Sequence, residues 1–258
     1  RRFLAKGHTF RLQQSKFNGK VEKRDPPRVL YGTDILGQVA NLEVIFGKTQ
    51  EKPSGPTSQW KKKSIFFKLP YWEFNLLCHN LDVMNIEKNV CGCILFTLLR
   101  KYHLVVREDL RAMKIRKELW PLPIGKTCPA TSFTLDKKKI EIVLKSLKGM
   151  SFPNGYASNI SRCMDLKNRR IFRLKSYDNH MLLHDLLPLA IRNVLFISVS
   201  RVLVEFGSCF KELCFLVIKI SKLDKLQESF VISLCHMQMV FPPSFFIVMV
   251  HLVVHLVE

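Results

Sequence analysis

The chain has 258 residues, and 47% of them are hydrophobic, so it can bury one large core or two small ones. Lysine and arginine number 41 against 21 aspartate and glutamate residues, which gives a formal net charge of +20. This composition excludes a chain too polar to bury a core. The positive field attracts polyanions, so nucleic acid is the first partner to consider.

The ends of the sequence and its cysteines bear on location. The opening RRFLAKGHTF lacks the apolar core of a signal peptide, the first residue is not Met, and the last residues close a hydrophobic run. We therefore expect a fragment of a longer protein. None of the eight cysteines forms a CxxC pair. They are expected to be reduced, buried thiols of an intracellular protein, either nuclear or cytoplasmic.

Residues 1–59 are expected to form a basic arm and a linker. Phe3, Phe10 and Phe17 recur every seven residues, but nearby glycines favour a loose arm over a helix. The arm could track phosphates with aromatic anchors, or it could be a solvated surface segment, which we favour. Residues 33–46 predict a helix and then a strand, and residues 47–59 have the composition of a linker.

Residues 60–99 show the steepest contrast in the chain, with a lysine cluster beside an apolar run. Ile65–Phe67 predict a short strand, which Pro70 ends. Residues 83–99 predict a helix, with Glu87 and Lys88 opposite an apolar stripe made of Val83, Ile86, Val90, Ile94 and Leu98.

Two further helices follow. Residues 107–119 predict a helix whose basic face carries Arg107, Arg111, Lys114, Arg116 and Lys117. In the next helix, Thr134 can be the cap, Asp136 lies in the first turn and Gly149 ends it. Its apolar face consists of Ile140, Val143, Leu144 and Leu147.

The last third is strongly hydrophobic. A leucine-rich helix over residues 181–187 is expected to kink or end at Pro188. Long helices are predicted over residues 199–220 and 223–240, the second ended by Pro242-Pro243. Residues 229–257 contain no Lys, Arg, Asp or Glu, yet the two prolines and two histidines disfavour a membrane span, so a membrane partner is not expected.

Several blocks resemble one known family. WKKKSIFFKLPYWEF, LDVMNIEKNV, MKIRKEL, GYASNISRC and LLPLAIR are similar to blocks in the terminal part of the transposase of plant CACTA (En/Spm-type) transposons. The last stretch of the sequence, MVFPPSFF followed by VMVHL, resembles the start of an uncharacterised domain that follows the transposase in the same proteins. The resemblance implies a ribonuclease H-like fold, in which three acidic residues hold two divalent metals for phosphodiester chemistry.

The resemblance also implies that the catalytic set is incomplete. The family's first two acids lie upstream of the matching blocks, which leaves Asp82, Glu87 and Glu118 as remnant candidates for the third. Asn85 stands where the family has the second histidine of a zinc-binding pair with His79. The sequence therefore predicts no catalytic site, no metal and no cofactor.

Two other clusters contain side chains that could bind a ligand. His180 and His184 share a helix face near Asp178, but the HExxH pattern of metalloproteases is absent because residue 181 is Met. A basic patch has two interpretations, a phosphate contact or a solvated loop. Together with the lysine cluster, it gives these candidate nucleic-acid-binding residues: Lys61, Lys62, Lys63, Lys167, Arg169, Arg170 and Arg173.

These observations predict a mainly α fold with a few short strands. Residues 60–193 would be a partial remnant of a ribonuclease H-like transposase domain, and residues 194–258 the truncated helical start of the following domain. The expected function is that of a transposon-derived, catalytically inactive fragment that retains DNA binding. The alternative is a non-enzymatic interaction or membrane-associated protein that uses the hydrophobic tail, and an active nuclease is a third, disfavoured interpretation.

Overall fold

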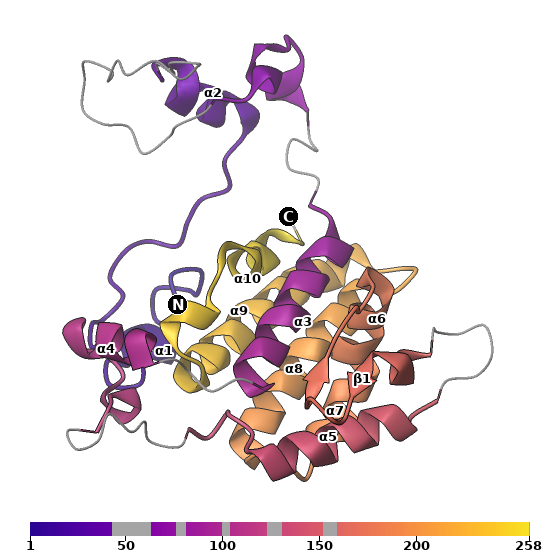
Figure 1. Ribbon diagram of the computed structural model, residues 1–258. Helices are drawn as coiled ribbons and strands as arrows, with labels where there is room; N and C mark the ends of the chain where they lie inside the picture. Colours follow the sequence, from indigo (N-terminus) through magenta and orange to yellow (C-terminus); the bar gives the residue numbers. More distant parts are fainter. Residues whose placement is uncertain (43–62, 76–80, 100–103, 123–130, 152–158, 258) are drawn as a thin grey trace, which may run out of the picture. The chain divides into compact units, whose positions relative to one another are not determined.

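A computed structural model describes residues 1–42, 63–75, 81–99, 104–122, 131–151 and 159–257. Helices dominate, and the only sheet among these residues is the antiparallel pair β1 (Met164–Asp165) and β2 (Arg170–Ile171) (Figure 1). The prediction of a mainly α chain with short strands is confirmed, and the ribonuclease H-like ancestry stays a prediction.

The chain forms two compact units, one of residues 27–81 and one of residues 1–26 with 82–258. These units reflect packing, and the sequence-based division at residues 59/60 and 193/194 stays a prediction. The helical segments of the larger unit are α1 (Thr9–Leu12), α3 (Val83–Leu99), α4 (Leu104–Ala112), η3 (Lys117–Leu119), α5 (Lys137–Gly149), η4 (Ile160–Cys163), α6 (Ser176–Met181), η5 (Leu182–Leu186), α7 (Leu187–Ile191), α8 (Ile197–Leu213), η6 (Ile220–Lys222), α9 (Leu223–Val240), η7 (Pro243–Phe245), α10 (Val248–Leu252) and η8 (Val253–His255).

The smaller unit consists of α2 (Gly32–Ala40), η1 (Ile65–Lys68) and η2 (Trp72–Phe74). Gly32 permits a close approach, since a Cβ there would lie 2.3 Å from the carbonyl oxygen of Glu73. The predicted strand at Ile65 is wrong, because the Ser64 hydroxyl accepts from Phe66 N–H and caps a 3₁₀ turn instead. The strand expected near residue 46 lies outside the described residues.

Helix α3 is central to the larger unit and packs against α6, η5 and α10 (Figure 1). Its predicted apolar stripe is confirmed, with Ile86, Val90 and Leu98 buried. Lys88, predicted opposite this stripe, is exposed, but the same prediction is wrong for Glu87, because α6 and η5 pack over it and leave its side chain 0% exposed.

Helix α5 follows its predicted apolar face, but the capping residue differs. The Asp136 carboxylate accepts from Lys139 N–H, so Asp136 rather than Thr134 is the N-cap. The predicted helix over residues 107–119 is also wrong in extent. It ends at Ala112, after which Lys114 and Arg116 take left-handed backbone angles that no helix continues.

Arg107 and Arg116 do not share a basic face. Arg107 is buried and donates to the Leu119 carbonyl, whereas Arg116 donates to carbonyls at the end of α9. These two arginines therefore act as structural donors to the main chain.

A continuous helix runs through α6, η5 and α7, past Pro188. Its middle turn is a π-helix, in which Leu187 N–H bonds to the carbonyl of Leu182, five residues earlier. Pro188 has no N–H and would clash with the preceding turn of a regular α-helix, and the wider turn accommodates it. The proline distorts the helix, as expected, but does not end it.

Helices α8 and α9 pack along each other, with Phe206, Phe210 and Phe230 in edge-on ring contacts. The bounds of α9 match the prediction. Helix α8 ends at Leu213 instead of residue 220, and the apolar side chains that follow, such as Leu216, are exposed.

The N-terminal arm packs against the C-terminal helices. Leu4 is buried with Val231, Cys235 and Val254, and the three phenylalanines of the seven-residue repeat pack against this cluster. The buried guanidinium of Arg11 donates to the carbonyls of Arg2 and Leu4, each at 2.8 Å, and to that of Arg24. The expectation of a loose, solvated arm is therefore wrong, because the repeat supplies packing residues.

The hydrophobic tail also contributes to the core. Phe241, Phe245, Val250 and Val253 are buried, while Val248 is exposed. Within the described ranges, no helix is long and apolar enough to cross a membrane.

Candidate functional site

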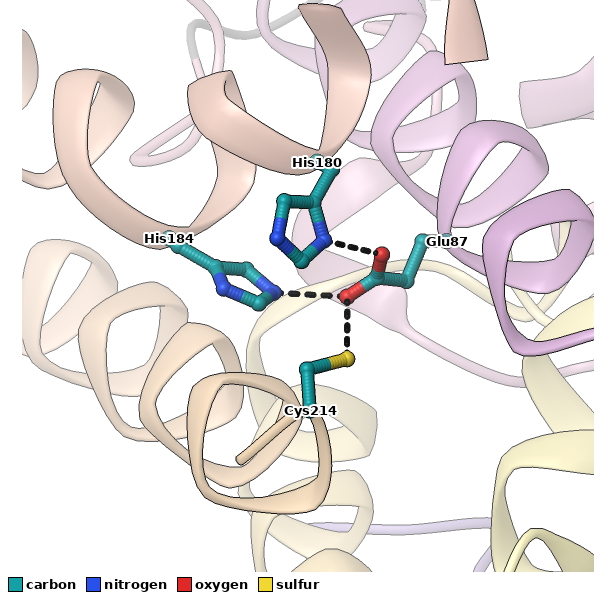
Figure 2. A group of neighbouring side chains, drawn as sticks. All are labelled: Glu87, His180, His184 and Cys214. Carbon is teal, nitrogen blue, oxygen red and sulfur yellow. Dashed lines mark hydrogen bonds and ion pairs between the residues drawn. The ribbon is translucent and has the colours of Figure 1, made fainter. Parts of the chain in front are cut away.

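A buried carboxylate from α3 is the centre of the candidate site (Figure 2). Glu87 Oε2 lies 2.7 Å from His180 Nδ1, and Glu87 Oε1 lies 2.6 Å from His184 Nε2. Since an ionised carboxylate only accepts hydrogen bonds, both imidazoles donate to it. One carboxylate thus joins α3 to α6 and to the π-turn η5.

The two histidines come from consecutive turns of the distorted helix. His180 and His184 lie with ring centroids 4.1 Å apart, and Tyr177 stacks on His180 at 5.7 Å. The side chain of His184 is 5% exposed and that of His180 is 19% exposed. The aromatic contact and the burial restrict the orientation of both imidazoles.

Cys214 completes the group from the end of α8, where it is the C-cap residue. Its thiol donates to Glu87 Oε1 at 3.8 Å. The residue as a whole is exposed, but its sulfur faces the buried carboxylate. Burial of the thiol, and then the charge of Glu87, raise the pKa of Cys214 to about 12. The same two causes raise the pKa of buried Cys91 to about 12.

Isolating the charge of Glu87 from water costs several kcal/mol unless partners compensate it. The hydrogen-bond partners of Glu87 are the two imidazoles and the Cys214 thiol. One oxygen, two nitrogens and one sulfur lie within 4.8 Å of one another, and in the described part of the chain no other group of three or more His, Cys, Asp or Glu side chains could hold a metal. The chemistry available is metal coordination or hydrogen bonding.

The three remnant candidates do not come together as one carboxylate cluster. Asp82 is exposed and caps α3 by accepting from Asn85 N–H at 3.1 Å. Glu118 pairs with Arg116 and is 60% exposed. Glu87 is bound to histidines instead of to other acids, so among the described residues no three carboxylates are placed to hold two metal ions.

The predicted basic patch forms one surface feature, the β1–β2 hairpin. Asp165 accepts from Asn168 and from Arg170, and these hydrogen bonds lower the pKa of Asp165 to about 2. A shallow hollow of about 720 Å³ lies beside the hairpin, with Lys137, Lys138 and Arg169 in its lining. The exposed predicted residues on the hairpin and just after it are Lys167, Arg169, Arg170 and Arg173.

The lysine cluster is described only in part. Lys61, Lys62 and His79 lie outside the described residues. Lys63 is half-buried, and its Nζ lies 3.5 Å from the Ala40 carbonyl. Asn85 is exposed and accepts a hydrogen bond from Asn89.

A separate cavity of about 620 Å³ lies between the N-terminal arm and the α9–α10 region. Two arginines in its lining are bound to other parts of the same chain. Arg1 donates to the carbonyl of Gln13 and stacks on Phe17, and Arg116 donates to Val240 and Phe241. These contacts occupy two of the four arginines in the cavity lining.

The fold and the site together define a helical protein with a Glu-His-His-Cys group around a buried carboxylate and a separate basic hairpin. Residues 213–258 match a family described as a domain of unknown function, DUF4218. No curated protein and no solved structure matches the chain. The matched segment begins one residue before Cys214, and it includes the stretch whose sequence resembles the start of an uncharacterised domain.

Proposed function

We propose that this chain is a transposon-derived, nucleic-acid-binding segment that does not cleave DNA by itself. The observation that carries the proposal is the basic hairpin with the residues just after it, where Lys167, Arg169 and Arg173 are exposed. Arg169 lines one hollow together with Lys137 and Lys138 of α5. Cationic side chains at this density suit phosphate contacts, which supply most of non-specific DNA affinity. The net charge of +20 adds a long-range attraction.

The non-catalytic part of the proposal is supported by the surroundings of Glu87, which is bound to histidines. A transposase centre needs several carboxylate oxygens around each metal ion. Asp82 instead caps helix α3, and Glu118 pairs with an arginine.

The test is binding of a labelled DNA duplex measured by fluorescence anisotropy across a salt series. A triple alanine variant of Lys167, Arg169 and Arg173 should reduce the slope of log affinity against log salt by roughly 0.9 for each phosphate that the variant no longer neutralises. The matched control removes the same charge elsewhere, with alanine at exposed Lys148, Lys222 and Lys225.

Equal slopes for the two triple variants, or no binding at low salt, would contradict the proposed binding site. Cleavage is assayed with Mg²⁺ and with Mn²⁺, and none is expected. Cleavage that disappears in Glu87→Ala would overturn the non-catalytic part of the proposal.

A further inference from the structure

We propose that Glu87, His180, His184 and Cys214 form a structural zinc site that joins four helical segments of the larger unit (Figure 2). The proposal stands on geometry, since the four donor atoms already lie within 4.8 Å of one another. It does not depend on nucleic-acid binding.

A tetrahedral ion would draw together the donor atoms that now lie up to 4.8 Å apart and would separate those in hydrogen-bond contact. Zinc bonds of about 2.0–2.3 Å place tetrahedral donors roughly 3.3–3.8 Å apart. The separation of Cys214 Sγ and Glu87 Oε1, 3.8 Å, already lies at the upper end of this range. The two Glu87–imidazole distances, 2.6 and 2.7 Å, are hydrogen bonds and would each open by roughly 0.6–0.9 Å on metal entry.

The charges also balance. A Zn²⁺ ion with one carboxylate and one thiolate is neutral, and the two imidazoles add no charge, so the group would carry no net charge. On binding, the Cys214 thiol releases its proton to solvent. Each imidazole must offer a lone pair to the ion, so the proton that it now gives to Glu87 passes to its other ring nitrogen or to solvent.

The donor types select the metal class. Mg²⁺ and Ca²⁺ require six or more oxygen ligands, whereas a set of one oxygen, two nitrogens and one sulfur suits zinc. With four protein ligands, no position is left for a substrate or an activated water, which is typical of a structural site. The exposed position of Cys214 offers the ion a route from solvent.

The site would hold together segments far apart in the sequence. Glu87 belongs to α3, the histidines to α6 and η5, and Cys214 to the end of α8. Cys214 also lies inside the matched segment 213–258, whereas the other three ligands lie before it. The ion would therefore fix the start of that segment to the preceding helices.

The test uses the full chain, stripped of metal with a chelator. Zinc affinity is measured by competition with a chromophoric chelator, and Co²⁺ serves as the spectroscopic probe of geometry. We expect one ion per chain, visible absorption typical of tetrahedral cobalt and a sulfur-to-cobalt charge-transfer band. The variants are Cys214→Ser and His184→Ala, and circular dichroism monitors their folding.

Matched controls remove the same side-chain types outside the site. Cys93→Ser replaces a thiol of α3, whose sulfur faces the Phe245 carbonyl, and His236→Ala breaks a histidine–carboxylate pair with Glu205. Both controls should bind zinc as the unmodified chain does. Cys214→Ser should lose the charge-transfer band, and each site variant should lose at least the ~10–100-fold in affinity that removal of a mere outer-shell partner costs.

Absence of zinc binding by the unmodified chain would overturn the proposal. Binding that persists undiminished in the site variants would also overturn it. Because Cys214 is exposed at a helix end, its serine variant is expected to fold. The cobalt spectrum of Cys214→Ser therefore tests the metal site even if His184→Ala does not fold.

Discussion

The crossing of α8 with the π-turn η5 depends on Gly207, and Gly207→Ala tests it. An added Cβ would lie 2.7 Å from the carbonyl oxygen of Leu183, which is inside the van der Waals limit. Overpacking of this kind costs about 1–3 kcal/mol. Alanine in a helix recovers roughly 0.5–1 kcal/mol relative to glycine, so the net loss should be about 0.5–2 kcal/mol.

The control is Gly92→Ala in α3, where nothing lies within 4 Å of the new methyl group. This variant should gain roughly 0.5–1 kcal/mol from helix propensity alone. The two variants therefore differ by about 1–3 kcal/mol, the cost of the clash itself.

The assay is urea unfolding followed by circular dichroism. With an m-value of about 2–3 kcal/mol/M, the two midpoints should separate by roughly 0.3–1.5 M. Gly207 and Cys214 lie seven residues apart, two helical turns along one side of α8 and its cap, so the same variant should weaken zinc binding. Equal midpoints for the two alanine variants would refute the close approach of α8 to Leu183.

Three further variants test the rest of the larger unit. Arg11→Gln should lower the free energy of unfolding by about 2–4 kcal/mol, because three carbonyls lose a charged donor. Limited proteolysis should then release residues 1–26 faster than in the unmodified chain. Phe245→Ala should lower the free energy of unfolding in urea by about 3–5 kcal/mol. Val248 is exposed, so Val248→Ala should change it by less than about 0.5 kcal/mol. Similar values for the two variants would contradict a packed tail. Burial, and then neighbouring His255, lower the pKa of His251 below its ordinary 6.5. The unfolded state then binds more protons below pH 6.5, so stability should fall as the pH decreases through that value, and His251→Asn should flatten this part of the curve.

The sequence predicted helices best where periodicity and a stop signal agree. Helix α9 has a regular apolar pattern and two prolines after it, and both of its ends were predicted correctly. The apolar stripes of α3 and α5 were also visible, because side chains three and four apart share a face. The prediction extends helix α4 too far because Lys114 and Arg116 have good helix propensity, and nothing in the local sequence indicates their left-handed angles.

The site was only half visible in the sequence. The spacing of His180 and His184 pointed to a shared face, but their partners come from far away in the chain. A helical pattern shows that Glu87 lies beside the apolar stripe and cannot show that a second helix covers that side. Cys214 gave no signal, because single cysteines in apolar runs are usually buried packing residues.

The packing of the N-terminal arm has a consequence for the order of folding. Phe3, Phe10 and Phe17 are synthesised well before Val254, which belongs to the cluster that they pack against. Such non-local contacts form slowly, and aromatic side chains without their partners favour aggregation during synthesis. Ribosome-bound intermediates of this chain should therefore depend on chaperones until α9 and η8 have emerged.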